Sequence, residues 1–363
     1  MKWPGLKEAG ITYSLASKWY GSDPFEMYLY LGLGLEEDKP PEDNLMWGDV
    51  AHHGLEHLIA KPILSKDFEP EDWGDIYQSM EEYAEDKWPT MLPQHLHSTK
   101  RMMGLYNDLY KLEYENFYTE LPFSVPYKTA SGIECTLRGK VDGIEILENK
   151  IGNQKTNIPR SVLDKYIGPN RTLGGTLVEH KFKGRYDRAK EAREIPVDLQ
   201  STMYMFATGA RKVIYDVIRI PDTQYALPPR RQRQSLTNYV DELYFSKNWG
   251  DFPVASKRLK WIYQDSFEFT DEDIEYRMRT TVDPVIEQIH EWYEFCSQPN
   301  FDPFDVKNYG KNFYKRPLRL FDPAKTQTWE GPYYDLHTGQ IDIDELIPIK
   351  GFYNELPSET PDV

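Results

Sequence analysis

Helical periodicity dominates the first third of the chain. Residues 44–60 repeat apolar positions at the three- and four-residue spacing of an amphipathic helix. Residues 75–118 are rich in Met, Leu, Tyr and Glu and indicate further helices, broken near Pro89 and Pro93. We therefore expect residues 1–120 to form a mainly helical part.

The pattern changes to that of strands after this part. Residues 121–147 contain short β-branched segments separated by Gly and Ser turns, and "GTLVEHKFK" (175–183) is a further apolar strand. Residues 196–209 begin with Pro and end with Gly, as helices commonly do, and "KVIYDVIRI" (212–220) is again a strand. The order strand, strand, strand, helix, strand predicts an α/β (α+β) fold with a central mixed β-sheet flanked by helices.

The last third has weaker patterning. Residues 221–260 form a polar, Arg-rich connection, whereas 270–297 predict one long helix that Pro284 kinks. Residues 298–363 are rich in Pro, Tyr and Asp and are expected to be mostly irregular. We expect the whole region from 221 to pack as an extension on a central part.

Length and composition indicate a soluble protein. The 363 residues suffice for one large domain, which we divide into 1–120, 121–220 and 221–363. The chain is 28% charged and 39% apolar, and no apolar run approaches the length of a membrane span. Its start lacks the apolar core of a signal peptide. We expect a cytoplasmic protein, or one of the host cytoplasm if a virus encodes it, with no membrane partner.

The charge distribution leaves a nucleic-acid partner open. A net charge of −16 argues against phosphate binding, which uses Lys and Arg. The charge is uneven, however, because residues 66–86 are strongly acidic whereas 181–193 hold six basic and two acidic residues. An enzyme that gathers metal-binding carboxylates can be acidic overall and still have a basic groove. Cys135 and Cys296 are too few for a disulfide framework or a cysteine-only metal site, and we expect ordinary thiols.

The strand at 175–183 carries the candidate chemistry. Side chains alternate along a strand, so Glu179 and Lys181 share one face while Val178 and His180 point the other way. If the strand that holds Asp142 is a neighbour, Asp142, Glu179 and Lys181 converge. Two carboxylates bind a hard divalent ion, and a lysine can orient or deprotonate water or neutralise a phosphate. This arrangement suits metal-assisted phosphodiester hydrolysis, although an isolated E-x-K is usually a salt bridge.

Three further features favour a site. Gln200 and Tyr204 lie one helical turn apart and can contact phosphate or stack on bases. Basic residues follow the strand and would line the path of a phosphate backbone: Lys183, Arg185 and Arg188. In "GDVAHHGLEH" (48–57), two pairs are also one turn apart: His52 with Glu56, and His53 with His57. Imidazoles bind Mn²⁺ or Fe²⁺, and clustered histidines also suggest zinc, but the HExxH pattern is missing.

Taken in order, these motifs resemble the PD-(D/E)XK nuclease superfamily, in particular its RecB-type branch, which includes many phage exonucleases. The resemblance covers roughly residues 12–220 and rests on four motifs: GxxxHxxxE at Gly48, His52 and Glu56; GxxD at Gly139 to Asp142; E-x-K at Glu179 and Lys181; and QxxxY at Gln200 and Tyr204. It implies a restriction-endonuclease-like core over 121–220.

The resemblance also implies roles for individual residues. The metal, Mg²⁺ or Mn²⁺, would be held by His52, Asp142, Glu179 and the backbone carbonyl of His180. Lys181 would be the catalytic lysine, acting with Asp142 and Glu179. Gln200 and Tyr204 would support the site and the DNA, and Glu56 would position its helix.

Two departures from the family pattern stand out. Many members of the branch hold an iron–sulfur cluster on four cysteines, but Ser22 and Asp23 stand where the first would fall, and 311–334 contain none. We expect no cluster, and expect aromatic packing near the carboxy terminus to take its place. The connection 147–174 is longer than a hairpin loop, with a short helix expected at "PRSVLDKY" (159–166). Its length leaves Glu145 as an alternative partner for Glu179.

The expected function is a divalent-metal-dependent DNA nuclease, an exonuclease of phage or mobile-element origin used in DNA recombination, replication or repair. Its partners would be single- or double-stranded DNA ends, and a single-strand annealing or replication protein. Two alternatives stay open: a nucleic-acid-binding protein of the same fold without turnover, and a zinc hydrolase built on His52, His53 and His57.

Overall fold

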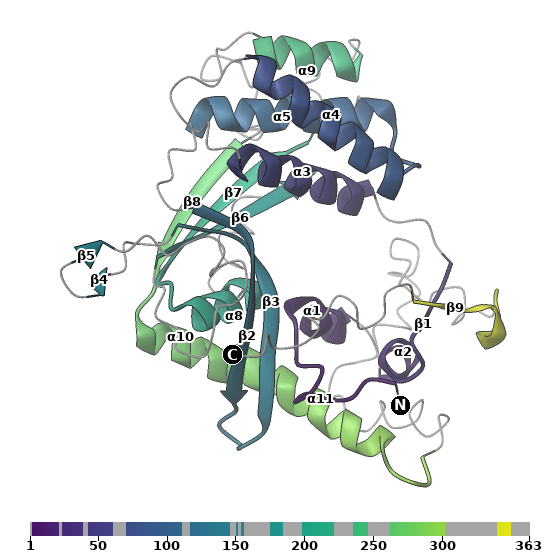
Figure 1. Ribbon diagram of the computed structural model, residues 1–363. Coiled ribbons are helices and arrows are strands. Elements are labelled where there is room, and N and C mark those ends of the chain that lie inside the picture. The colour runs from purple at the N-terminus through teal and green to yellow at the C-terminus, as the bar shows by residue number, and fades with distance from the viewer. Residues whose placement is uncertain are drawn as a thin grey trace, which may run out of the picture.

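The protein is an α/β structure whose five-stranded mixed sheet carries helices on both faces (Figure 1). The computed structural model describes residues 2–21, 24–38, 43–60, 70–110, 117–145, 150–151, 154–155, 175–183, 198–220, 235–245, 262–301 and 340–349. The expected class of a mixed sheet flanked by helices is confirmed.

Nine α-helices and three short helices of other types occur in this described part. The α-helices are α1 (Tyr13–Gly21), α2 (Pro24–Met27), α3 (Asp43–Ala60), α4 (Pro70–Lys87), α5 (Pro93–Tyr110), α8 (Leu199–Thr208), α9 (Leu236–Phe245), α10 (Asp271–Arg277) and α11 (Asp283–Cys296). Two π-helices are η1 (Tyr28–Leu33) and η5 (Met278–Val282), and η7 (Ile343–Glu345) is a 3-10 helix.

The main sheet has the strand order β2-β3-β6-β7-β8. Its strands are β2 (Phe117–Lys128), β3 (Glu134–Glu145), β6 (Thr176–Lys183), β7 (Lys212–Arg219) and β8 (Ile262–Glu268). All pairs are antiparallel except β6 and β7, which are parallel and are joined through α8. A parallel pair needs such a crossover, so the predicted helix across the sheet is confirmed. Two minor sheets pair β1 (Leu35–Glu36) with β9 (Ile347–Pro348) and β4 (Lys150–Ile151) with β5 (Gln154–Lys155).

Each face of the main sheet covers a separate hydrophobic core. On one face, Leu177 and Val213 pack with Met203 of α8 and with side chains of α1 and α11. On the other, Phe182 and Ile218 pack under α3, α4, α5 and α9. Figure 1 shows these four helices gathered above the sheet, whereas α1, α8, α10 and α11 lie below it. A functional group on β6 therefore faces one core or the other according to its position in the strand.

Aromatic contacts join the amino-terminal segment to α11. The rings of Trp19 and Trp292 meet edge to face with centroids 5.8 Å apart, and those of Trp3 and Tyr293 at 5.3 Å. The indole N–H of Trp19 also donates to Gln288 Oε1 at 3.1 Å. These contacts involve α11, whereas residues 302–339 and 350–363, in the region where aromatic packing was expected, lie outside the described residues.

Several local predictions need correction. The connection 221–260 contains a helix, α9, whose buried face includes Tyr239 and Val240. Strand β8 at the sheet edge was not predicted, because "IYQDSFE" alternates too weakly to stand out. The expected helix over 270–297 is present as α10, η5 and α11, and the π-turn directly precedes Pro284. The expected helix at 159–166 lies outside the described residues.

Among the described residues, no helix combines the length and apolar character needed to cross a membrane. Both cysteines are free and buried, and burial raises the pKa of each thiol to about 12. They are therefore protonated and unreactive near neutral pH, as expected for ordinary thiols.

Candidate active site

Strand β6 presents an acid and a base to the core beneath the sheet. Lys181 Nζ donates to Glu179 Oε2 at 2.9 Å and to Gln200 Oε1 at 2.7 Å. His180 points to the opposite face, where it meets Tyr106 of α5. The alternation predicted for this strand is confirmed, and it brings the E-x-K pair against α8.

Asp142 joins this pair from the neighbouring strand. β3 and β6 pair only at Ile144–Leu177 and Glu145–Thr176. Continued along both strands, the same register sets Asp142 opposite Glu179, and Asp142 Oδ2 lies 3.6 Å from Lys181 Nζ. The alternative acid, Glu145, lies in the paired part of the ladder, opposite Thr176. Asp142 is thus the carboxylate that the sheet brings to Lys181.

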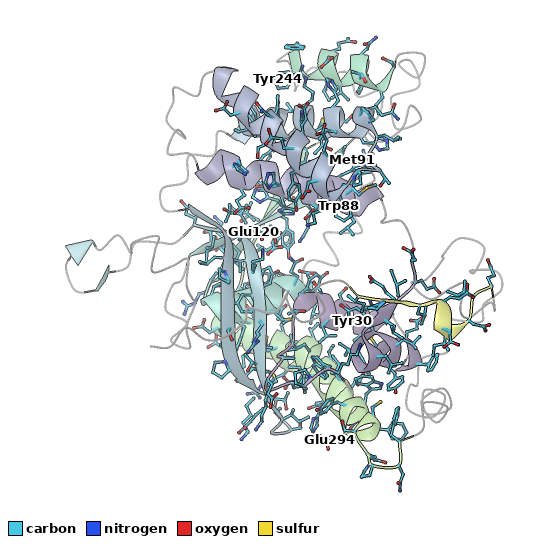
Figure 2. All side chains as sticks on the ribbon, turned by 45° about the vertical axis from the view of Figure 1, so that its right-hand side comes forward. Tyr30, Trp88, Met91, Glu120, Tyr244 and Glu294 are labelled. Carbon is cyan, nitrogen blue, oxygen red and sulfur yellow. The ribbon has the colours of Figure 1, made fainter. Side chains whose placement is uncertain are left out.

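The backbone is strained beside this acid. Glu120 has a φ of 50° and is the one non-glycine residue with positive φ among those described. Glu120, which Figure 2 labels, lies on β2 between the pairs Thr119–Gly143 and Leu121–Val141. This register sets it opposite Asp142 of β3. Such conformations are disfavoured for residues with a Cβ and concentrate at functional sites. The strained residue therefore lies at the same position along the sheet as Asp142.

Helix α8 completes the cluster. Its N-cap Asp198 accepts from Ser201 N at 2.8 Å, and Gly209 ends it in the left-handed conformation. Gln200 and Tyr204 share the buried face, where Gln200 Nε2 donates to Tyr204 OH at 3.2 Å. The first turn of α8 therefore holds Gln200 against Lys181, and the two motif residues form one hydrogen-bonded chain with it.

This cap yields a testable prediction. Asp198→Ala removes the acceptor at the start of α8 and should cost about 1 kcal/mol of unfolding free energy. It should also lower the nuclease activity proposed below, because Gln200 lies two residues further on. The matched control is Thr270→Ala at the N-cap of α10, which removes a bond to Asp273 N and sits outside the cluster. We expect the two variants to lose similar stability in urea unfolding, but only Asp198→Ala to lose activity in DNA hydrolysis. Equal activity losses would contradict the assignment.

The three ionisable side chains of the cluster shift one another's pKa values. Burial raises the pKa of Glu179 to about 8, opposed by Lys181 and reinforced by the charge of Asp142. Burial would also raise the pKa of Asp142, but Lys181 and then His52 outweigh it and hold this pKa below its usual range. For Lys181, burial is outweighed by Glu179 and Asp142, so its pKa stays well above the ordinary value. Strongly perturbed carboxylates around one lysine are typical of catalytic sites.

The residues present fit a hard divalent cation. Glu179 is 1% exposed, and its Oε1 has no hydrogen-bond partner. A buried carboxylate oxygen without a donor is costly unless another ligand satisfies it. Asp142 adds a second carboxylate, and Mg²⁺ commonly takes one or two protein carboxylates with water and phosphate as its other ligands. Within the described residues, no group of three His, Cys, Asp or Glu side chains is already gathered around one point.

His52 lies beside this cluster rather than in it. It comes from α3 on the other side of the sheet, where its half-buried ring meets Phe182 edge to face at 5.4 Å and His180 at 6.4 Å. Its contribution to the pKa of Asp142 shows that the two groups are within electrostatic range. Glu56, one turn along α3, is exposed. The structure therefore brings Asp142, Glu179, Lys181, Gln200 and Tyr204 together, with His52 adjacent.

A buried polar network behind His180 was missed by sequence reasoning. The Tyr106 hydroxyl donates to Asp216 Oδ2 and lies 3.2 Å from His180 Nε2, and Gln264 Nε2 donates to Asp216 Oδ1 at 2.9 Å. Burial lowers the pKa of His180 to about 3 and raises that of Asp216 to about 6. A carboxylate in the middle of the apolar strand "KVIYDVIRI" was the available signal. These hydrogen bonds hold His180 on the face of β6 that lies opposite the cluster.

The predicted cationic path is largely undescribed. Lys183 is the last residue of β6, and its side chain, like Arg185 and Arg188, lies outside the described part of the chain. Most of the basic segment 181–193 lies there too. Their role in contacting DNA stays a prediction.

No protein-family model and no curated protein matches the chain. The resemblance to PD-(D/E)XK nucleases therefore rests on the sequence motifs alone.

Proposed function

We propose that the protein is a divalent-metal-dependent DNA nuclease of the PD-(D/E)XK type, acting as an exonuclease in DNA recombination, replication or repair, and encoded by a phage or mobile element. The observation that carries the proposal is the meeting of Asp142, Glu179 and Lys181, from two strands, with Gln200 and Tyr204 of α8. These residues come from three separate elements of the chain, β3, β6 and α8.

The side chains support phosphodiester hydrolysis in complementary ways. A bound Mg²⁺ or Mn²⁺ would supply Lewis acidity and lower the pKa of a water ligand. Asp142 and Glu179 would hold this ion, with the carbonyl of His180 and the side chain of His52 as further expected ligands. Lys181 is held by Glu179 and Gln200 as a protonated ammonium, which suits charge neutralisation at a phosphate oxygen.

Gln200 and Tyr204 would contribute by holding other groups of the site in place. Gln200 accepts from Lys181 and donates to Tyr204, so it sets the direction of the ammonium. Tyr204 also packs edge to face on Phe123 of β2 at 5.6 Å. This contact ties α8 to the β2–β3 hairpin that carries Asp142, and a fixed geometry between catalytic groups accelerates reactions.

The geometry favours this function over a zinc hydrolase. That alternative requires His52, His53 and His57 to share one ion. His52 faces Phe182 and His180, whereas His53 and His57 both face Ser79 of α4. The three histidines therefore face two separate locations and do not surround one ion.

The decisive experiment compares end-labelled linear duplex, single-stranded and circular DNA with Mg²⁺, with Mn²⁺ and with EDTA. Degradation of linear DNA that requires metal and spares circles is expected. Binding without cleavage with either metal would overturn the proposal in favour of a nucleic-acid-binding protein without turnover.

A paired substitution tests which acid partners Glu179. Asp142→Asn should lower metal-dependent hydrolysis by about 100-fold, because it removes one of two anionic ligands. Glu145→Gln, the matched control three residues away on β3, should leave the rate within about twofold of the parent, since it lies in the paired ladder. Single-turnover rates at saturating Mg²⁺ would measure both, and the reverse order would assign the site to Glu145.

A further inference from the structure

Two histidines of α3 aim at one hydroxyl of α4. His53 Nε2 lies 3.0 Å and His57 Nε2 lies 3.2 Å from Ser79 Oγ. The two rings are one helical turn apart, with centroids separated by 4.5 Å. A serine hydroxyl has one proton, so it donates to only one of these nitrogens and accepts from the other. An ion between these three atoms could take one lone pair from each imidazole and one from the hydroxyl.

The surrounding side chains hold the inner ring in this direction. His53 is stacked on Tyr83 of α4 with centroids 4.1 Å apart and planes 7° from parallel. Tyr83 OH donates to Asp49 Oδ2 at 2.8 Å, and the indole N–H of Trp88, labelled in Figure 2, donates to the same oxygen at 2.7 Å. Packing and hydrogen bonds thus orient one ligand in advance, which reduces the entropy lost on binding. His57 is exposed, so the site opens to solvent.

We propose that His53, His57 and Ser79 form a binding site for one Zn²⁺ ion that links α3 to α4. Paired imidazoles favour borderline ions such as Zn²⁺, Ni²⁺ and Cu²⁺, whereas Mg²⁺ favours carboxylates. The site is thus chemically distinct from the Asp142–Glu179 cluster. With two imidazoles, a hydroxyl and water as ligands, it binds less tightly than a closed structural zinc site.

Zinc binding would stabilise the helical layer above the sheet. An ion bound only by the folded state raises stability in proportion to the logarithm of its concentration. The site joins the two helices at His53 and His57 of α3, beside His52 in the middle of that helix. Its effect is on stability and does not depend on nuclease activity.

The test is Zn²⁺ titration of the full chain without a polyhistidine tag. Calorimetry on the Glu179→Gln variant, which disables the carboxylate cluster, should show one equivalent of Zn²⁺ bound. Zn²⁺ alone should also raise the unfolding midpoint by a few degrees. His57→Ala should lose both effects, and Ser79→Ala should weaken binding by about tenfold.

His97→Ala is the matched control. His97 is a partly exposed histidine of α5 that bonds Asp241 at 3.0 Å, so its loss removes one imidazole outside the site. This variant should bind Zn²⁺ like the parent. The proposal is overturned if the parent binds no Zn²⁺, or if His57→Ala and His53→Ala both retain the equivalent. Because His57 is exposed, its replacement leaves the core intact, and circular dichroism would verify the fold.

Discussion

Replacement of Lys181 by methionine is expected to reduce metal-dependent DNA hydrolysis by about 10³-fold, with little change in DNA affinity. The side chain keeps its length but loses the ammonium that contacts Asp142, Glu179 and Gln200 together. The substitution also removes the positive charge that lowers the pKa of both Asp142 and Glu179. Single-turnover rates and fluorescence anisotropy, measured on the same preparation, would separate chemistry from binding.

A matched control exists on the other side of the sheet. Lys100 of α5 is a largely buried lysine bonded to Glu81, with its side chain 9% exposed. Lys100→Met should therefore perturb stability as Lys181→Met does, while leaving the rate per folded molecule unchanged. If both variants hydrolyse DNA at the parent rate, Lys181 has no catalytic role and the proposed site fails.

Asp216→Ala is expected to destabilise the protein by about 3 kcal/mol. Asp216 is fully buried and accepts from Tyr106 and Gln264, so alanine removes the acceptor of the buried Tyr106 hydroxyl and opens a cavity, whereas the exposed Gln264 side chain can bond water instead. Tyr106 can still bond His180, which limits the loss. Urea unfolding followed by far-UV circular dichroism would measure the change.

The control for this variant is Asp241→Ala. Asp241 also has two partners, Arg101 and His97, but its side chain is 32% exposed. Water can replace its contacts, so the loss should stay below about 1 kcal/mol. Similar losses for the two aspartates would show that burial of the Asp216 network contributes little to stability.

The local geometry of the candidate site was largely predictable from sequence. Strand alternation alone predicted that Glu179 and Lys181 share a face, and helical spacing predicted the pairing of Gln200 with Tyr204. Both follow from backbone periodicity, which needs no knowledge of distant contacts. The Gly end of the predicted helix likewise matches α8, whose C-cap is Gly209, because caps are set by local chemistry. The helix begins at Leu199 behind the N-cap Asp198, three residues after the predicted start.

Features that depend on how separate elements meet were not predictable. Spacing placed His52, His53 and His57 together, but successive positions on a helix point in different directions, and α4 selects two of them through Ser79. The Asp216 network needed the register of β6 with β7 and the position of Tyr106. Strand β8 was missed because its alternation is weak. Helix α9 was missed although the helical spacing of its apolar residues was a signal available in the sequence: Leu236, Tyr239, Val240 and Leu243.

The aromatic contacts between the amino-terminal segment and α11 have a consequence for the rate of folding. Trp3 and Trp19 find their partners at Tyr293 and Trp292, so the core beneath the sheet cannot close until the ribosome has released α11. Contacts of such long sequence separation close late and slow folding. The helical layer of α3, α4 and α5 has short-range contacts and can form during synthesis. The nascent chain thus exposes two tryptophans until α11 has been made, which makes chaperone binding to this segment an expected part of its biogenesis.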